Sequence, residues 1–284
     1  RLLPRKTRGG RIAFADHGPR DGIPMLCLHT ATTGRHLPAK AIAALQAHGL
    51  RPITLDRPGF GLTAMVEGDY LAHNALDILE ILDALGLERA CILARGGTMV
   101  LAYLAAHHAA RIDRAVVLNP EPPPQRDGRL TGLHGHVKHL VYSRPGLVAP
   151  LATHLSRRAS ARTVERLVLK VVGGSAADRQ TLSDPEILAG YVRATQQSAM
   201  QGGAGFLAIA RTEPHDSIVS LADGSMITIL CGAEDTMYAA ADSVPYWQSI
   251  WPGARAEIVE RAGRMLLFQR PDLIAAALCG NAAE

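Results

Sequence analysis

The feature that most constrains the fold is a series of short, uninterrupted apolar runs, including 25–28 (MLCL), 91–94 (CILA) and 226–231 (MITILC). A strand that is apolar at every position needs cover on both faces, which is typical of parallel sheets flanked by helices. Stretches with apolar residues at helical spacing lie between such runs, for example 71–85, which ends before Gly86. This alternation predicts an α/β fold with a mostly parallel sheet and helices on both faces.

The same pattern locates the other elements. Strands are expected at 12–16, 52–55, 115–118 and 256–259, and helices around 41–45 and at 99–108, 240–251 and 271–278. The alternation stops at 119–124 (NPEPPP), and the next 100 or so residues show helix-like stretches at 157–172 and 187–199 but no clear strand. The sequence therefore predicts a core domain made of residues 1–120 and 221–284, with a helical cap inserted at 121–220.

Composition excludes several classes of protein. Of the 284 residues, 48% are hydrophobic, which is too many for a disordered chain. The 30 Lys and Arg residues against 26 Asp and Glu give a net charge of only +4, and aromatic residues make up 4%. We therefore expect neither a strongly basic nor a base-stacking surface, and nucleic acid is not a predicted partner. No apolar run reaches the ~18 residues that a transmembrane helix requires.

The cysteines indicate a reducing environment. Cys27, Cys91 and Cys231 lie inside predicted buried strands, where a thiol acts as a small hydrophobic side chain. The spacing of the cysteines fits neither a disulfide framework nor a metal site. Residues 1–10 are basic but have no apolar stretch behind them, unlike a signal peptide. We therefore expect a soluble, cytoplasmic protein.

Five segments that follow predicted strands carry distinctive sequences: 28–31 (LHTA), 55–63 (LDRPGFGLT), 93–98 (LARGGT), 231–235 (CGAED) and 262–271 (AGRMLLFQRP). Their order and spacing resemble the α/β-hydrolase superfamily over nearly the whole chain, and 55–63 is the most specific match. The resemblance implies an α/β-hydrolase fold with a small-molecule substrate and no cofactor. It also implies that 28–31 supplies an oxyanion amide, 93–98 the nucleophile, 231–235 the acid and 262–271 the histidine of a catalytic triad.

The segment at the nucleophile's place departs from that pattern. A nucleophile elbow is a tight turn that needs small residues on either side of the reactive one. Counting forward from the strand puts Gly96 at the nucleophile's position, whereas counting back from the following helix puts Arg95 there. Glycine has no side chain to attack with, and a guanidinium stays protonated. Thr98 is the nearest hydroxyl, but it belongs to the helix and is expected to point away.

Two further departures affect the same site. Arg264 stands where the superfamily has histidine, and a guanidinium that titrates near ~12.5 cannot act as a general base. Thr30 replaces the glycine that usually lies beside the oxyanion amide. Asp235 alone matches the triad. The sequence therefore predicts a degenerate triad in which the nucleophile and histidine positions are substituted.

The residues left at the site are suited to binding an anion. The candidate catalytic residues are Asp235, Arg264, His29 and Arg95, and the candidate substrate-binding or oxyanion residues are Thr30, Ala31, Gly96, Gly97 and His36. Backbone amides at a helix N-terminus favour anions, and two arginines beside them would bind a carboxylate, a phosphate or an enolate. A plain alternative is an Arg264–Asp235 ion pair that only fills the space. His29 likewise admits a structural role, in which it bonds the loop backbone.

Three functions fit these observations. The first is a repurposed hydrolase that binds a small anionic or carbonyl-bearing molecule under the cap. Such a protein would catalyse a non-hydrolytic step without a cofactor, such as elimination, decarboxylation, isomerisation or cyclisation. The second is a non-catalytic binding or interaction protein, and the third is an ester or lactone hydrolase in which water attacks directly.

No metal site is expected, because the histidines at 134, 136 and 139 lack a ligand motif. Glu121, just after a predicted strand, is either a solvated loop residue or a replacement acid. The oligomeric state is open, a homodimer included.

Overall fold

The computed structural model describes residues 1–121, 140–141, 143–169, 174–212 and 218–280. Its centre is an eight-stranded sheet in the order β1-β2-β4-β3-β5-β6-β7-β8. β2 is antiparallel to β1 and to β4, and all other neighbours are parallel, which confirms the predicted α/β fold. The strands are β1 Leu2–Pro4, β2 Arg11–Asp16, β3 Ile23–Leu28, β4 Leu50–Leu55, β5 Ala90–Ala94, β6 Ile112–Leu118, β7 Ile227–Gly232 and β8 Arg255–Val259.

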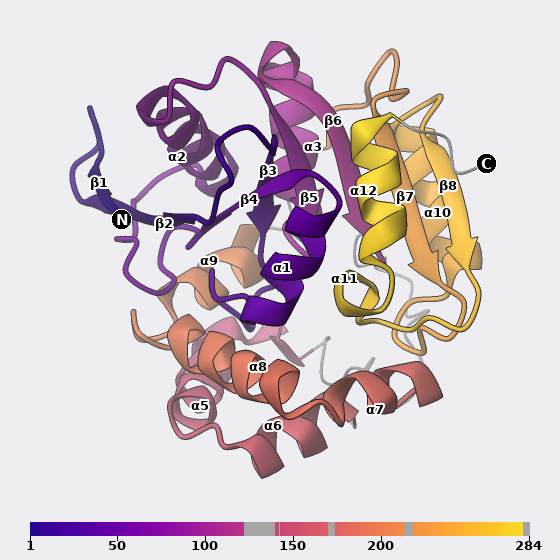
Figure 1. Ribbon diagram of the computed structural model, residues 1–284. Helices are drawn as coiled ribbons and strands as arrows, with labels where there is room; N and C mark the ends of the chain where they lie inside the picture. The colour runs from indigo at the N-terminus through magenta and orange to yellow at the C-terminus, as the bar shows by residue number, and fades with distance from the viewer. Residues whose placement is uncertain (122–139, 142, 170–173, 213–217, 281–284) are drawn as a thin grey trace.

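Helices cover both faces of the sheet, as the apolar runs require. In β3, Leu26 and Leu28 belong to the core on one face, and Met25 and Cys27 belong to the core on the other. The first core also contains residues of α2 (Tyr70–Ala84), α3 (Thr98–His107) and α10 (Ala240–Ile250). The second contains residues of α1 (Ala39–Ala47), α11 (Leu266–Gln269) and α12 (Pro271–Cys279), and Figure 1 shows α1 and α12 in front of the sheet.

Five more helices lie together beyond the carboxyl ends of the strands, where the arrowheads of β6 and β7 point in Figure 1. They are α5 Pro145–Arg157, α6 Ala161–Leu167, α7 Ala176–Leu182, α8 Pro185–Ser198 and α9 Ala204–Thr212. The helix-like stretch expected at 157–172 contains α6, which begins after its N-cap Ser160 and not at 157, where α5 ends. The Ser160 side chain accepts a hydrogen bond from the backbone N–H of Thr163 and so caps the N-terminus of α6.

This helical layer is hydrogen-bonded to the loop that follows β4. The backbone N–H of Gly61 donates to the carbonyl of Gln197 in α8 at 3.1 Å, and the N–H of Gly205 in α9 donates to the carbonyl of Gly59 at 3.1 Å. A Cβ on Gly59 would lie 2.5 Å from the backbone nitrogen of Gly205. The glycines of this loop therefore allow two backbones to meet, which places α8 and α9 next to the ends of the central strands.

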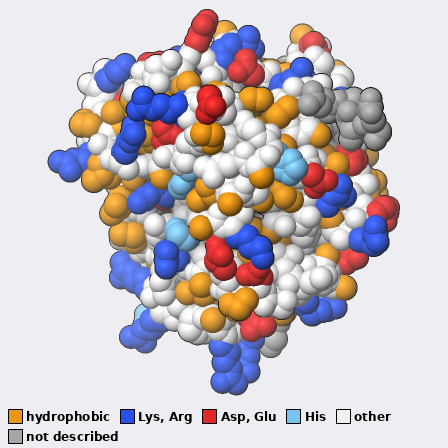
Figure 2. Space-filling model, viewed as in Figure 1, with side chains coloured by type: hydrophobic (Ala, Val, Ile, Leu, Met, Phe, Trp, Pro, Cys, Tyr) orange, Lys and Arg blue, Asp and Glu red, His pale blue; other side chains and the backbone are white. Residues whose placement is uncertain are grey.

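The surface carries mixed charge. On the face seen in Figure 2, Lys and Arg side chains are spread among acidic and uncharged ones and form no continuous basic area. Of the helices in the described ranges, none is long and apolar enough to cross a membrane. The cysteines are free thiols, and Cys27, Cys91 and Cys231 are buried in the sheet as expected. Burial raises the pKa of the Cys27 thiol to about 12, which fits a side chain that serves only as packing.

Candidate functional site

The turn between β5 and α3 lies at the centre of the site. β5 ends at Ala94, and α3 begins at Thr98. The three residues between them are Arg95, Gly96 and Gly97, so the turn contains no hydroxyl, thiol or carboxylate side chain. Gly97 is the N-cap of α3 and has φ 68°, a left-handed conformation that favours glycine. The sequence rule that small residues surround this turn therefore has a direct conformational reason.

The loop after β3 passes so close to the turn that residue 96 has no space for a side chain. A Cβ on Gly96 would lie 2.7 Å from the Cα of Thr30 and 3.2 Å from the carbonyl oxygen of His29. The Thr30 hydroxyl is bonded to that of Thr33, with 2.9 Å between the two oxygens. Gly96 is thus fixed by the path of the neighbouring backbone.

His29 has both ring nitrogens bonded to backbone. Nδ1 lies 2.7 Å from the carbonyl oxygen of Thr30, and Nε2 accepts a hydrogen bond from the N–H of Arg57 at 3.0 Å. This arrangement requires the neutral tautomer with its proton on Nδ1. Burial, followed by the nearby charge of Arg57, lowers the pKa of His29 well below its usual value. The ring has the geometry of a loop-positioning group.

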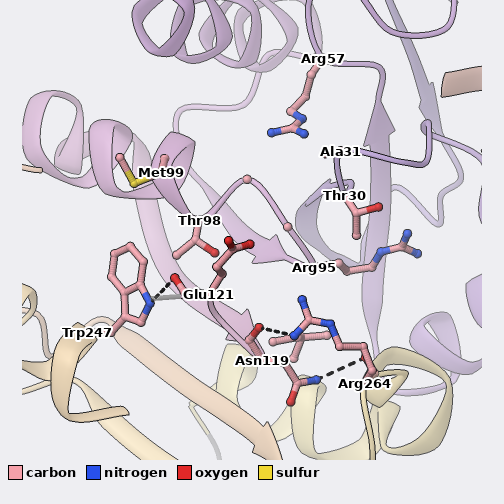
Figure 3. Close-up of a pocket in the computed structure, with 13 residues that line it drawn as sticks. Thr30, Ala31, Arg57, Arg95, Thr98, Met99, Asn119, Glu121, Trp247 and Arg264 are labelled. Atoms are coloured by element: carbon pink, nitrogen blue, oxygen red, sulfur yellow. Dashed lines mark hydrogen bonds between the residues drawn. The ribbon is translucent and has the colours of Figure 1, made fainter. Parts of the chain in front are cut away.

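Arg264 and Asp235 form an ion pair at the ends of β7 and β8. Arg264 Nη1 donates to Asp235 Oδ2 at 2.9 Å and to the carbonyl of Asn119 at 2.9 Å. Figure 3 shows the guanidinium beside Asn119, below the turn that carries Arg95. The guanidinium carbon also lies 4.6 Å from the ring centre of Tyr238. The Asp235 side chain is 1% exposed, so Arg264 neutralises a carboxylate that is withdrawn from solvent.

Asp178 of α7 holds the backbone of the loop that carries Arg264. Its carboxylate accepts hydrogen bonds from the backbone N–H groups of Arg264 and Met265, each at 3.0 Å, and from the Gln269 side chain at 2.9 Å. The sequence did not indicate this role, because α7 was not predicted. The position of Arg264 therefore depends on a helix that lies outside the sheet.

A pocket of about 110 Å³ opens between these loops. Of the predicted site residues, Thr30, Ala31, Arg95, Gly96, Gly97 and Arg264 line it. Asp235 reaches the pocket only through Arg264, and His29 lies behind the loop backbone. His36 is not at the pocket, since its backbone N–H donates to the Gln197 side chain of α8 at 3.2 Å. The structure thus brings together the two arginines and the turn, but not the two histidines.

Other residues complete the lining, which Figure 3 displays as sticks. Arg57, Thr98, Glu121 and Trp247 all border the pocket, and the Trp247 indole N–H donates to the carbonyl of Glu121 at 3.0 Å. The pattern DRPGFG contains Arg57 but gives no sign that its side chain turns into the pocket. Glu121 lies shortly after the end of β6 at Leu118, and this position after a strand was the sequence feature that pointed to the site.

Two predictions concern metals and the inserted segment. Among the described residues, no group of three His, Cys, Asp or Glu side chains could hold a metal ion. The histidines at 134, 136 and 139 lie outside the described residues. The stretch expected to be helical at 187–199 corresponds to α8. Burial raises the pKa of the Tyr191 phenol in this helix, and the nearby charge of Arg95 partly opposes that rise.

Comparison with known proteins identifies the fold family. Residues 23–271 match the family described as alpha/beta hydrolase fold. A haloalkane dehalogenase of Mycobacterium marinum is 31% identical over 129 residues, which are 44% of this chain and 43% of that protein. A 3-oxoadipate enol-lactonase of Acinetobacter baylyi is 29% identical over 120 residues, which are 42% of this chain and 44% of that protein. The matches thus span less than half the length of these curated relatives.

Solved structures resemble the chain over almost its full length. The epoxide hydrolase CorEH has a TM-score of 0.72 at 18% identity, with 99% of this chain and 98% of that chain covered. A thermophilic esterase from Thermogutta terrifontis has a TM-score of 0.68 at 16% identity, with 99% and 96% covered. At this level of identity the likeness shows the fold alone.

Proposed function

We propose that this chain, which belongs to the α/β-hydrolase fold family, binds a small anionic or carbonyl-bearing molecule and acts on it without a covalent intermediate. The observation that carries the proposal is the ion pair between Arg264 and Asp235, with 2.9 Å between Nη1 and Oδ2. The resemblance assigns position 264 to the catalytic histidine and Asp235 to its acid. A guanidinium in this place occupies the acid but cannot accept a proton from a hydroxyl.

The turn after β5 supports the same proposal. Neither Gly96 nor Arg95 can form a covalent ester with a substrate. Thr98, the nearest hydroxyl, is the first residue of α3, and the described residues that line the pocket with it include no histidine. His29 is bonded to backbone at both nitrogens. We therefore interpret the triad as degenerate, with Asp235 its one matching member.

The remaining charges suit the stabilisation of negative charge. Arg95 and Arg264 both line the pocket, and no ion pair involving Arg95 is found among the described residues. Fixed guanidinium groups in a cavity withdrawn from water can stabilise an enolate or a developing carbanion. The reaction classes that need this and no nucleophile include elimination, decarboxylation, isomerisation and cyclisation. In this proposal no cofactor takes part, and residues 121–220 act as a cap over the pocket.

A second candidate is an ester or lactone hydrolase in which water attacks directly. The names of the curated relatives, a dehalogenase and an enol-lactonase among them, favour hydrolysis. Asp235 is bound to Arg264 and His29 to the backbone, so neither is poised to activate water. The carboxylate of Glu121, which lines the pocket, is the better candidate for the base.

The test combines a panel of p-nitrophenyl esters with a fluorophosphonate label. We expect no covalent label and no burst of p-nitrophenol, because no side chain forms an acyl intermediate. Labelling of the protein would overturn the proposal. Steady turnover that is lost in Glu121→Gln and kept in Thr98→Val would establish direct water attack instead.

Measuring ligand affinity tests whether Arg264 takes part in binding at the pocket. Arg264→Ala should weaken the binding of a carbonyl-bearing ligand found by screening by at least tenfold, since it removes a charge-assisted hydrogen bond. Arg270→Ala is the control, because Arg270 forms an exposed pair with Asp272 away from the pocket. Equal affinity in the two variants would contradict a role for Arg264 in the site.

A further inference from the structure

Arg57 is a buried cation for which the described residues provide no counter-ion. Only 1% of the residue is exposed, and its Nε and Nη1 atoms have no hydrogen-bond partner. The guanidinium carbon lies 5.3 Å from the ring centre of Phe60, which is the one favourable contact of this charge given by the described residues. A cation–π contact offsets only part of the cost of removing a charge from water. The side chain therefore has unsatisfied donors and an uncompensated charge.

The acids near Arg57 have other partners. Asp56, the preceding residue, accepts hydrogen bonds from the side chain and backbone N–H of Arg35 and from the backbone of Leu62. Glu121 borders the same pocket and has interactions of its own. Neither carboxylate is hydrogen-bonded to Arg57. Among the described residues, no carboxylate is therefore bonded to the Arg57 guanidinium.

The guanidinium is directed at the N-terminus of α3. A Cβ on Gly97 would lie 3.0 Å from Arg57 Nη1, so the guanidinium reaches the N-cap residue itself. α3 has ten residues and no side-chain cap, and its first residues, Thr98 and Met99, line the pocket. Figure 3 shows the Arg57 side chain extending from its own loop towards this helix end.

Two sources of positive potential thus meet in one place. The N-terminus of a helix carries roughly half a positive charge, and its first amides have no partner within the helix. A cation placed there is unfavourable unless an anion joins it. The glycine at position 97 favours this approach, since a Cβ there would lie 3.0 Å from Arg57 Nη1, closer than most real Cβ contacts.

We infer that the carboxylate group of a small ligand binds between the Arg57 guanidinium and the N-terminal amides of α3. The inference rests on the proposed function in using the same pocket as a ligand site, and it names the charged group by which the ligand is held. A singly charged carboxylate matches one guanidinium, and the carboxylate of Glu121 at the pocket's border disfavours an anion of higher charge. The rest of the ligand then extends towards Arg95 and Arg264.

The experiment titrates the purified full chain with sodium acetate at constant ionic strength, with chloride as the exchanged ion and inorganic phosphate as a second probe. Tryptophan fluorescence reports binding, because Trp247 lines the pocket and the chain has only 2 tryptophans. We expect saturable acetate binding that Arg57→Met weakens at least tenfold and Arg57→Lys weakens less. Arg270→Met, the matched control outside the pocket lining, should change acetate affinity less than threefold.

Several outcomes would overturn the inference. They are equal acetate affinity in the wild type and Arg57→Met, loss of binding in Arg270→Met, and tighter binding of phosphate than of acetate. If Arg57→Met does not fold, the Arg57→Lys comparison and an acetate-dependent rise in the wild-type Tm decide the question. Absence of acetate binding to the wild type also overturns the inference. It leaves the proposed function standing on its own labelling test, because that proposal admits an uncharged carbonyl ligand.

Discussion

Two groups of buried arginines in this molecule differ in what surrounds them. At the edge of the sheet, Arg5 donates to both oxygens of Asp77 at 2.8 and 2.7 Å, and both side chains are fully buried. Arg8 joins them, at 2.9 Å from Asp77 and 2.7 Å from Glu80. In the pocket, Arg57 is equally buried, and no acidic side chain among the described residues pairs with it. The first group compensates its charge within the chain, whereas the second does not.

The difference separates a structural use of arginine from a binding use. A buried ion pair contributes little to stability when intact, but breaking it leaves a charge without compensation. Arg5 and Arg8, paired with Asp77 and Glu80, therefore hold the N-terminal segment against α2. A buried arginine without an acidic partner should lower the stability of the folded protein and favour the binding of an anion.

The largest effect should come from breaking the edge group. Asp77→Asn removes the charge that Arg5 and Arg8 share, and we expect the free energy of unfolding to fall by about 3–5 kcal/mol. Urea denaturation followed by circular dichroism measures the loss. A decrease of less than about 1 kcal/mol would show that Glu80 alone can compensate both arginines, and the contrast with the pocket would weaken.

The next effect concerns pH and the histidine that touches Arg57. Burial, with a contribution from Arg57, holds the pKa of His29 well below 6.5 in the folded state. The unfolded chain therefore takes up a proton that the folded chain does not. Stability from this group is complete above pH 6.5 and falls by up to about 1.4 kcal/mol per pH unit as the pH decreases below that value.

His29→Gln should flatten this dependence in urea titrations between pH 7 and pH 5. Arg57→Met should flatten it only in part, because burial is the larger cause of the lowered pKa. His108→Gln serves as the comparison, since His108 is partly exposed and has a smaller burial contribution. Identical slopes for the wild type and His29→Gln would mean that His29 is protonated in the folded protein.

A smaller effect, of opposite sign, is expected in the pocket. In the absence of a bound anion, Arg57→Met should leave the free energy of unfolding unchanged or raise it by up to about 1 kcal/mol, since it removes an uncompensated charge. The same substitution at Arg5 should lower it. Urea denaturation in chloride buffer compares the two. A large loss of stability in Arg57→Met would show that Arg57, like Arg5, serves mainly to stabilise the fold.

The smallest effect is expected at an exposed pair. Arg270 and Asp272 lie 2.7 Å apart with 39% and 48% of their side chains exposed. Asp272→Asn should change the free energy of unfolding by no more than about 0.5 kcal/mol, because solvent and salt screen the pair. Urea denaturation of Asp272→Asn measures this change in the free energy of unfolding. A loss comparable to that of Asp77→Asn would show that burial is not what distinguishes the arginines.

Much of the fold could be predicted because its signals are local. The runs at 91–94 and 226–231 became β5 and β7, and the helix expected at 71–85 became α2. β1 was missed because its three residues are too short for a periodic pattern. The helices at the strand ends were harder to locate, since α7 has only seven residues and is held by contacts such as that between Asp178 and the 264 loop.

The sequence offered the Arg264–Asp235 pair and the bonding of His29 to the loop backbone as alternatives, but it gave no sign of how Arg57 is oriented. The loops that carry Arg95 and Arg264 follow strands, so parallel-strand geometry brings them together. The orientation of Arg57 is different, because the guanidinium lies against Gly97, which is 40 positions away in the sequence. His36 is not among the residues that line the pocket, and its backbone N–H donates to Gln197 of α8, a contact between segments far apart in the sequence.

The close approach of Thr30 to Gly96 also bears on how such a site can change over evolutionary time. With 2.7 Å between the Thr30 Cα and the place of a Cβ at position 96, a serine there is excluded until the 29–31 loop moves. At position 264 the constraint is of another kind: Asp178 holds the backbone of the loop, and any replacement of Arg264 leaves the buried carboxylate of Asp235 to be compensated. A serine at position 96 therefore requires a second change that moves the 29–31 loop, so one substitution at this turn is not enough to install a hydroxyl there.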